Sequence, residues 1–326
     1  MHGDEAALVL GLDIGGTSSR ALVSDLSGRV LGRGEAAGGN PNSHPPEQAA
    51  RQIADAARAA LAGIDPAAVR NCVIGMAGVS KMADPGFGAL FDSTWSGLGL
   101  RSPWQAISDC EVAFAAGTPD PDGTVLIAGT GAIAARIEQH RMVATIGGHG
   151  WLLGDEGSAF WLGREAVRAA LRALDRGEPL HGLTAAVRDR LLPDAPDAQR
   201  RELISAVNAA PPIRLAELAP LVTAATDETA ADIVRRAAQV LADTAAATRC
   251  HGESRTIVLA GGLVIPGNPV REALRGTLSA RGFQTQRTAG PGEAGAAWLA
   301  ALDLTDDPQT LHKRLLGRAA SGSREP

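Results

Sequence analysis

Cysteine and lysine are both scarce in this sequence, and each shortage limits the chemistry available. The three cysteines of the 326-residue chain, Cys72, Cys110 and Cys250, are far apart and odd in number. This spacing fits neither a disulfide framework nor the paired cysteines of a zinc or iron–sulfur site. Lys81 and Lys313 are the only lysines, so reactions that depend on a lysine have few candidates.

The chain also lacks a basic excess and a long apolar run. Its net charge is -5, its pI is near 5.8 and its basic residues are scattered, which argues against nucleic acid as a partner. No uninterrupted apolar stretch is as long as a membrane span, and the beginning MHGDEAALVL is acidic where a secretory signal is basic. We therefore expect no nucleic-acid or membrane partner and a cytoplasmic location.

The first part of the chain has the pattern of a sheet with helices. Three alternating segments joined by short turns predict an antiparallel meander at 6–13, 18–26 and 29–36. Apolar residues at helical spacing follow near 49–61. The run CVIGMAGV at 72–79 predicts a buried strand, and PWQAISDC, which ends at Cys110, predicts another.

The second part repeats the unit of strand, glycine turn and strand. An apolar strand leads into the turn at 129–131, and further strands flank a turn around Gln139 and His140. The Ala- and Leu-rich pattern from 156 to about 249 predicts helices, and 256–264 predicts a strand entering a glycine turn. A chain of this length with a repeated unit favours two domains.

The first glycine turn, DIGGT, suggests a phosphate site of an unusual kind. The Walker lysine is missing, and Ser19 stands where the dinucleotide fingerprint requires a glycine. Successive N–H groups of Gly15, Gly16 and Thr17 can instead contact phosphate, because glycine lets the backbone come close. Asp13 would repel bare phosphate, but it becomes useful if Mg²⁺ lies between them.

Two further turns make this interpretation more attractive than a simple hairpin turn. The sequence AGTGA, with Gly129, Thr130 and Gly131, offers a second phosphate cradle from the other half of the chain. The sequence LAGGLV, with Gly261 and Gly262, offers bare backbone against which an adenine or ribose could lie. Three spaced turns predict a nucleotide site.

These motifs resemble those of the sugar kinase, actin and heat-shock chaperone superfamily of ATPases. Within it, the chain is similar to the N-acetylglucosamine kinase family, which is grouped with the BadF/BadG/BcrA/BcrD-type ATPases. The resemblance covers nearly the whole chain and depends on the motifs LDIGGTSSR, VLIAGTGA, IVLAGGLV and, above all, GGHGWLLGDEGSAFWLG.

The resemblance implies an α/β fold with two ribonuclease-H-like (actin-like ATPase) domains around a nucleotide and sugar cleft. The expected bounds are 1–113 for the N-terminal domain and 114–304 for the C-terminal domain with a helical insertion. A C-terminal helix and a frayed tail would occupy 305–326. The implied reaction is phosphoryl transfer from ATP, with Mg²⁺, to a sugar hydroxyl.

The implied catalytic base, which would also touch the sugar, is Asp109 in ISDCEVAFA. A simpler interpretation is helix capping, because Ser108 and Glu111 have the spacing of a capping box. The two interpretations are compatible. A helix N-terminus would favour the ionised form of Asp109, which a base requires.

The resemblance also implies sugar contacts from amide, carboxylate and main-chain groups. The candidates are Asn40, Asn42, Gly147, Gly148, Asp155 and Glu156. Asn40 aligns better than Asn42, and Asp155 ranks above Glu156, although GDEGS is also typical of a turn and helix cap. His149 departs from the tryptophan of many relatives, which affects the expected N-acetyl pocket.

The leading hypothesis is an ATP- and Mg²⁺-dependent kinase for the 6-hydroxyl of N-acetyl-D-glucosamine. D-Glucosamine and N-acetylmuramic acid are alternative sugars, because the size of the acetyl pocket cannot be read from the sequence. An activating ATPase is a second alternative, although no cysteine pair for a shared cluster is visible. A sugar sensor without turnover is a third. The family often forms homodimers, but nothing in this chain alone establishes one.

Overall fold

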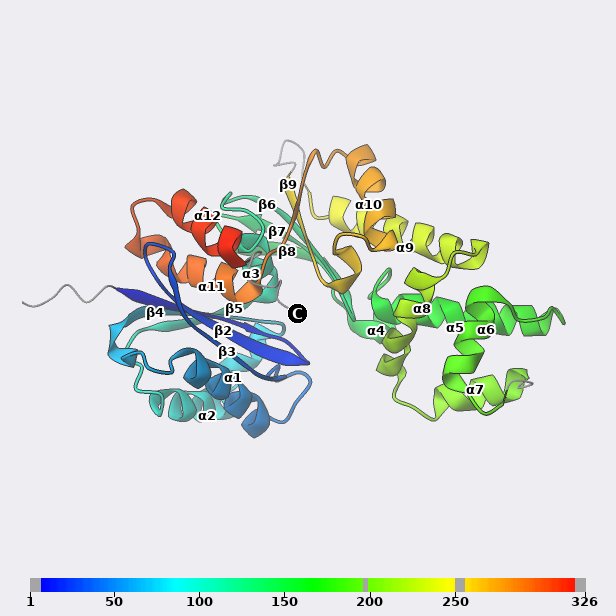
Figure 1. Ribbon diagram of the computed structural model, residues 1–326, viewed down its shortest axis with the longest axis horizontal. Coiled ribbons are helices and arrows are strands. Elements are labelled where there is room, and N and C mark those ends of the chain that lie inside the picture. Colours follow the sequence, from blue (N-terminus) through cyan, green and yellow to red (C-terminus); the bar gives the residue numbers. More distant parts are fainter. Residues whose placement is uncertain (1–6, 196–198, 250–255, 320–326) are drawn as a thin grey trace, which may run out of the picture. The chain divides into compact units, whose positions relative to one another are not determined.

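The computed structural model describes residues 7–195, 199–249 and 256–319 (Figure 1). They form two units, and each is described here by itself. The first unit contains the described residues up to Asp122, the segment Ile137–Met142 and the described residues from Ala289 onward. The second contains Gly123–Arg136 and the described residues of Val143–Thr288.

The first unit is built on a five-stranded sheet with the order β3-β2-β1-β4-β5. Its strands are β1 (Leu8–Ile14), β2 (Ser18–Asp25), β3 (Val30–Ala37), β4 (Val69–Met76) and β5 (Trp104–Ser108). β1, β2 and β3 form the predicted antiparallel meander, whereas β4 and β5 run parallel to β1. β4 ends three residues earlier than predicted, because Gly78, with a φ of 71°, leaves the extended conformation.

Helices cover this sheet. They are α1 (Pro46–Ala60), α2 (Pro85–Ser96), α3 (Asp109–Ala115), α11 (Gly292–Ala301) and α12 (Pro308–Ala319), with short 3₁₀ turns η1 (Pro66–Ala68), η2 (Val79–Ala83) and η5 (Leu302–Leu304). Leu10 and Leu12 of β1 belong to one apolar cluster with α1 and α2, whereas Val9 belongs to another with α11. β1 is therefore buried on both sides, which explains why it has an almost continuous apolar sequence.

The predicted domain bounds are wrong at the C-terminal end. α11 packs directly on β1, and a Cβ on Gly11 would clash with the main-chain nitrogen of Ala297. Trp298 of α11 donates to the carbonyl of Pro308 at 2.8 Å, which joins α11 to α12. The helices beyond residue 289 therefore belong with the N-terminal strands, and α12 continues into the predicted tail as far as Ala319. The rest of that tail lies outside the described residues.

The second unit has its own five-stranded sheet, with the order β10-β9-β6-β7-β8. Its strands are β6 (Gly123–Ala128), β7 (Ala132–Glu138), β8 (Arg141–Gly147), β9 (Thr256–Ala260) and β10 (Thr285–Thr288). β9 lies between β6 and β10 and is parallel to both. The predicted strand at 256–264 stops at Ala260, because Gly262–Val264 forms a 3₁₀ turn, η4, and β10 was not predicted.

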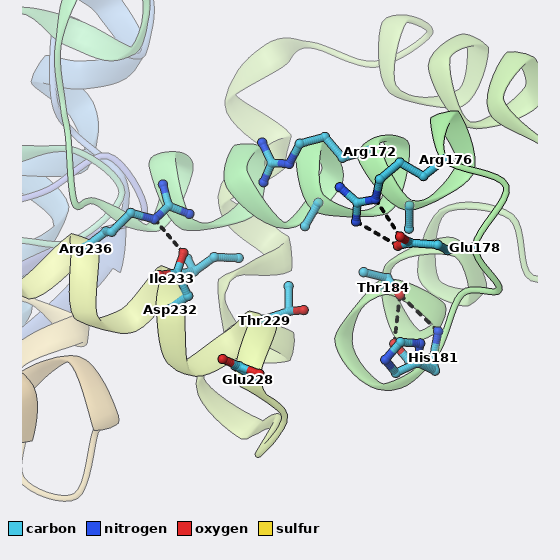
Figure 2. Close-up of a pocket in the computed structure, with 12 residues that line it drawn as sticks. Arg172, Arg176, Glu178, His181, Thr184, Glu228, Thr229, Asp232, Ile233 and Arg236 are labelled. Atoms are coloured by element: carbon cyan, nitrogen blue, oxygen red, sulfur yellow. Dashed lines mark hydrogen bonds and ion pairs between the residues drawn. The ribbon is translucent and has the colours of Figure 1, made fainter.

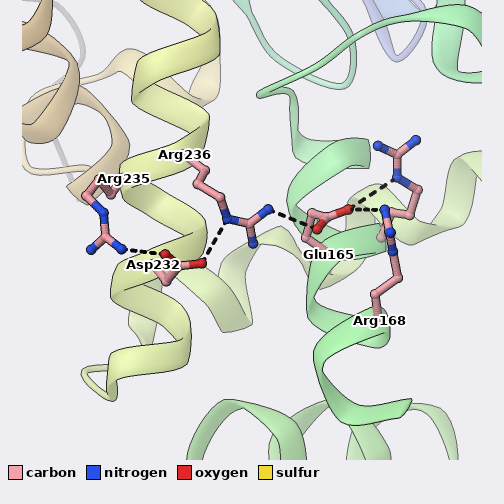
Figure 3. Close-up of polar contacts among 6 residues, drawn as sticks. Glu165, Arg168, Asp232, Arg235 and Arg236 are labelled. Atoms are coloured by element: carbon pink, nitrogen blue, oxygen red, sulfur yellow. Dashed lines mark hydrogen bonds and ion pairs between the residues drawn. The ribbon is translucent and has the colours of Figure 1, made fainter. Parts of the chain in front are cut away.

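The predicted helical region is present between β8 and β9. It contains α4 (Gly150–Leu153), α5 (Ala159–Asp175), α6 (Gly182–Leu191), α7 (Arg200–Asn208), η3 (Pro212–Leu218), α8 (Ala219–Ala224) and α9 (Glu228–Ala246), and α10 (Pro269–Ala280) follows β9. Buried Glu165 of α5 accepts from Arg168 at 2.9 Å and from Arg236 of α9 at 3.1 Å (Figure 3). This network gives the buried charge of Glu165 two cationic partners and joins α5 to α9. Among the described residues, no helix combines the length and apolar character that crossing a membrane requires.

Candidate active site

The predicted site residues of the first unit lie at one edge of its sheet. In the parallel part of the sheet, Ile14 is opposite Met76, and Met76 is opposite Ser108. The carboxyl ends of β1, β4 and β5 are therefore level, so the DIGGT turn and Asp109 leave the sheet at the same edge. Ligands of open α/β sheets bind at this edge.

Asp109 is the first residue of α3, and the capping interpretation also holds. Its Oδ1 accepts from the Ser108 hydroxyl at 3.1 Å and from the main-chain N–H of Cys110 at 3.0 Å. Burial raises the pKa of Asp109 above its ordinary value, and these hydrogen bonds offset only part of that rise. Burial, rather than the helix N-terminus, thus decides the direction of the pKa shift of Asp109. A raised pKa makes Asp109 a stronger proton acceptor once it is ionised.

Asp13 is the most perturbed acid at this edge. Its pKa is raised from 3.8 to about 6, first by burial and then by the negative charges of Glu293 and Asp109. Arg20, its cross-strand neighbour on β2, lowers the pKa and offsets part of the rise. A Cβ on Gly292 would clash with the Asp13 carboxylate, so only glycine fits at the first position of α11. Asp13 is thus held among negative charges with little water.

These groups fit a divalent cation that is shared with a ligand. Mg²⁺ prefers carboxylate oxygens and commonly takes one or two of them together with phosphate oxygens and water. The negative charges of Glu293 and Asp109 contribute to the raised pKa of Asp13, and a bound cation would offset them. Among the described residues, no group of three or more His, Cys, Asp or Glu side chains is placed to hold a metal by itself.

The DIGGT turn is closed by its own backbone. The N–H of Gly15 donates to the carbonyl of Ser18 at 2.9 Å, so this N–H is not directed at a ligand as predicted. Gly16 and Thr17 are exposed, which leaves them as the candidate donors. His44 bonds the carbonyl of Gly16 through Nε2 at 2.8 Å, and this contact connects the turn to the loop before α1.

That loop contains the two candidate asparagines. Asn40 is buried, its N–H donates to the carbonyl of Gly15 at 3.3 Å, and its Oδ1 accepts from the N–H of Asn42 at 2.8 Å. The amide of Asn42 lies over Gly78, where a Cβ would clash with its Nδ2. Asn40 therefore shapes the loop beside the DIGGT turn. Asn42 is exposed and sits next to the end of β4.

In the second unit, the other two glycine turns touch each other. The N–H of Gly129 donates to the carbonyl of Gly131 at 2.9 Å, a closure similar to that of the first turn. Gly261, with a φ of 97°, packs on the peptide between Ala128 and Gly129, where a Cβ would clash. By contrast, a Cβ on Gly129 or Gly262 would meet no described atom within 4 Å. Bare, open backbone of this kind suits close approach of a nucleotide.

Asp155 braces the second turn. It adopts a φ of 55°, and its Oδ1 accepts from the N–H of Ala132 at 3.2 Å. A Cβ on Gly131 would lie 2.7 Å from its other oxygen. Glu156, the next residue, is exposed.

The glycine pair at the end of β8 packs on the start of β7, the strand that follows the second turn. Gly147 and Gly148 have φ values of 78° and 68°, and the N–H of Gly148 donates to the carbonyl of Ala132 at 3.0 Å. A Cβ on Gly148 would be 2.7 Å from the side chain of Ile133. These two glycines, Asp155 and the turn at 129–131 therefore form one packed group within the second unit.

Sequence reasoning missed Glu293. Its carboxylate is buried, accepts from Arg33 of β3 at 3.2 Å and raises the pKa of Asp13. The sequence feature that could have revealed it is a single acid in GEAGAAWLAA, whose other residues are small or apolar. A buried acid in such a run requires a partner or a function.

A separate cleft lies in the helical part of the second unit. It has a volume of about 310 Å³, and its walls include Arg172 and Arg176 near the end of α5 and Asp232 of α9 (Figure 2). Arg176 donates two hydrogen bonds of 2.7 Å to Glu178. No predicted site residue lines this cleft. The predicted residues gather instead at the glycine turns of the two sheets.

The fold and these turns define a class of protein. Two α/β units, each with a five-stranded sheet and glycine turns at the carboxyl ends of its strands, are the architecture of the actin-like ATPases, and the predicted fold class is confirmed. The chain belongs to the BadF/BadG/BcrA/BcrD ATPase family, whose model matches residues 10–300.

Relatives with sequence similarity are kinases of amino sugars. The chain is 30% identical over 174 residues, 52% of its length, to an N-acetylmuramic acid/N-acetylglucosamine kinase of Clostridium acetobutylicum. It is 27% identical over 196 residues, 56% of its length, to an N-acetyl-D-glucosamine kinase of Dictyostelium discoideum. These matches span only 56% and 60% of the two relatives.

A solved structure supports the fold over most of the chain. A protein from Chromobacterium violaceum, provisionally assigned as an N-acetylglucosamine kinase, superposes with a TM-score of 0.71 at 23% identity. The superposition covers 91% of this chain and 99% of that protein. At this identity the likeness establishes the fold alone.

Proposed function

We propose that this protein is an ATP-dependent sugar kinase with Asp109 as its catalytic base. The observation that carries the proposal is the half-buried carboxylate of Asp109, with its raised pKa, at the same sheet edge as the DIGGT turn and Asp13. Perturbed acids at the carboxyl ends of strands are typical of functional sites. The family membership and the names of the two sequence relatives support the same reaction class.

Each group has a role that its chemistry suits. Asp109 accepts the proton of the sugar hydroxyl, a contribution of about 10²–10⁴-fold to the rate. Gly16, Thr17, Thr130 and Gly131 are the proposed N–H donors to the phosphates. Gly261 and Gly262 face the adenosine. When bound, Mg²⁺ supplies positive charge to the phosphates, and Asp13 is the residue that would hold it, directly or through water.

The proposed acceptor is the 6-hydroxyl of N-acetyl-D-glucosamine. Both sequence relatives are named for this sugar, and one is also named for N-acetylmuramic acid. N-Acetylmuramic acid is therefore the second candidate, and D-glucosamine is the third. Asn40, Asn42, Gly147, Gly148, Asp155 and Glu156 are the proposed sugar contacts. Asp155 and Asn40 would act partly through the loops that they hold.

The alternative of an activating ATPase has less support. Such a protein holds an electron-transfer cluster with cysteines at a dimer interface. Cys72 and Cys110 are both buried inside the first unit, and Cys250 lies outside the described residues. Bound iron in the purified protein would favour this alternative. A sugar sensor, in contrast, would bind the sugar without turning over ATP.

A coupled assay of ADP release tests the proposal. We expect Mg²⁺-dependent turnover with at least one of the three amino sugars, and phosphate on the 6-hydroxyl by NMR. Asp109→Ala should lower kcat by about 10²-fold or more while it leaves sugar binding largely intact. Asp92→Ala, which removes an exposed acid of the same unit, is the matched control and should retain full activity. Activity of Asp109→Ala within about tenfold of wild type would remove Asp109 from the role.

A further inference from the structure

Glu111 makes a pair of contacts that helix capping alone does not require. Its side chain is buried, with 8% of the residue exposed. One carboxylate oxygen, Oε2, accepts from the N–H of Ser108 at 2.7 Å and completes the capping box of α3. The other, Oε1, accepts from the N–H of Met142 at 3.2 Å. A single buried carboxylate thus joins the start of α3 to Met142, the second residue of β8.

The segment that Glu111 reaches is anchored to the first unit at several points. The N–H of Gln139 donates to Asp122 at 2.8 Å, and that of His140 donates to the carbonyl of Pro121 at 2.9 Å. The ring of His140 packs edge-on against Trp298 of α11. The tip of the β7–β8 hairpin, Ile137–Met142, therefore belongs to the first unit, whereas both strands continue into the second.

The two strands of this hairpin connect Glu111 to proposed ligand-binding groups. β7 begins directly after Gly131, and β8 ends at Gly147. At the other end of the contact, Asp109 is two residues from Glu111 and is the first residue of α3. Glu111 is the residue whose carboxylate holds the base-bearing helix start to the hairpin that carries the second glycine turn.

A second capping box shows what is special about Glu111. Glu202 of α7 occupies the same third helical position, and its carboxylate accepts from the N–H of Gln199 at 3.1 Å. Glu202 is exposed, and the described residues give it no second main-chain donor. The capping function therefore needs one carboxylate oxygen. The second oxygen of Glu111 makes other contacts: it accepts from the N–H of Met142 at 3.2 Å and lies 4.0 Å from a guanidinium nitrogen of Arg141.

We propose that Glu111 is a positioning residue that fixes Asp109 for proton transfer by tying α3 to the β7–β8 hairpin; this inference depends on the proposed kinase function. A carboxylate suits the task because two N–H donors require two acceptors. A glutamine of the same shape would offer one acceptor and turn its NH₂ group toward the other N–H. If Asp109 is displaced even slightly, kcat falls while the affinity for the ligands is kept.

Kinetics of two variants separate positioning from capping. Glu111→Gln preserves the size of the side chain but removes its charge, so it disrupts one of the two main-chain hydrogen bonds and also the ion pair of Oε1 with Arg141 at 4.0 Å. Met142→Pro removes the N–H that donates to Glu111, together with the methionine side chain, and it leaves the capping box intact. β8 is an edge strand, and this N–H is directed at Glu111 rather than along the ladder, so proline can be accommodated. Glu202→Gln is the matched control for loss of a capping glutamate.

We expect Glu111→Gln and Met142→Pro each to lower kcat about tenfold or more, with KM for ATP and for the sugar within about threefold of wild type. Glu202→Gln should retain the wild-type kcat. The inference is overturned if both variants keep kcat within about twofold, or if Glu111→Gln alone lowers it, because capping would then explain the effect. It is also overturned if the loss is in KM.

Hydrogen exchange keeps this test independent of the kinase proposal. In Glu111→Gln, the amides of Ser108 and Met142 should exchange faster, whereas those around Gln199 should not change. Unchanged protection of Met142 would show that the bridge is not formed and would overturn the inference. If wild type transfers no phosphate to any of the three sugars, the proposed function fails on its own, and the exchange result still reports whether Glu111 bridges the two elements.

Discussion

Replacement of Asp13 by asparagine should stabilise the ligand-free protein, because the wild-type carboxylate is ionised in a place that disfavours charge. Its pKa is raised from 3.8 to about 6 by burial and by the charges of Glu293 and Asp109. An asparagine side chain has nearly the same shape as the aspartate but carries no charge. When removal of a functional group makes a protein more stable, the group contributes to binding or catalysis rather than to folding.

The sign and the size of this change in the free energy of unfolding follow from the coupling between folding and the protonation of Asp13. The folded protein holds the proton of Asp13 more tightly than the unfolded chain does, so wild type loses stability as pH rises from about 4 to about 6. At 1.36 kcal/mol per pKa unit, a rise from 3.8 to about 6 corresponds to about 3 kcal/mol above that range. Asp13→Asn should therefore gain up to about 3 kcal/mol at pH 8 and less than about 1 kcal/mol at pH 4.5.

Urea unfolding of both proteins at pH 4.5 and pH 8, with EDTA present, measures this difference. Asp92→Asn is the control, because it removes an exposed acid from the same unit. Addition of Mg²⁺ and ATP should reverse the order, since ligand binding stabilises only the protein that binds. A free energy of unfolding for Asp13→Asn that is equal to or below that of wild type at pH 8 would refute the reasoning.

Four other substitutions test the packing of the glycine turns and Asp155. Gly11→Ala should destabilise the first unit by about 3 kcal/mol or more in urea unfolding, because its Cβ meets main chain of α11. Gly129→Ala has open space and should keep the wild-type Tm but weaken ATP binding about tenfold by calorimetry; retained affinity would argue against phosphate contact there. Gly261→Ala should lower the Tm markedly, because it has both a φ of 97° and a main-chain clash. Asp155→Ala should raise KM for ATP as well as for the sugar, and a change in the sugar KM alone would show that it does not brace the turn.

Much of the fold could be predicted because its periodic signals are local. The alternation at 18–26 and the tight turns made the meander of the first sheet visible, and the Ala- and Leu-rich pattern made the helices after β8 visible. β10 was missed because its four residues, Thr285–Thr288, contain no apolar side chain. The domain bounds failed for another reason. The packing of α11 on β1 joins residues that are far apart in the sequence. Its local sign in the sequence is the glycine at position 11, whose missing side chain makes room for α11.

The site was predictable as a set of residue types but not as a set of contacts. Asp109 was predicted from the family resemblance and Asp13 from its place before the glycine turn, and the structure brings both to one sheet edge. Glu293 could not be assigned to that edge, because 280 positions separate it from Asp13 in the sequence. The raised pKa of Asp109 could not be predicted either, since capping is visible in the sequence whereas burial by the rest of the fold is not.

The DIGGT and AGTGA turns share a hydrogen bond that limits which main-chain N–H groups can contact a ligand. In each turn the first glycine donates its N–H back into the turn, from Gly15 to Ser18 and from Gly129 to Gly131. That bond fixes the loop before any ligand arrives, so the ordering cost of binding is reduced. It also means that the first N–H is not available to a ligand. If the turns bind phosphate as proposed, the donors are the amides that follow, at Gly16 and Thr17 in the first turn and at Thr130 and Gly131 in the second, and glycine would keep the approach to them bare.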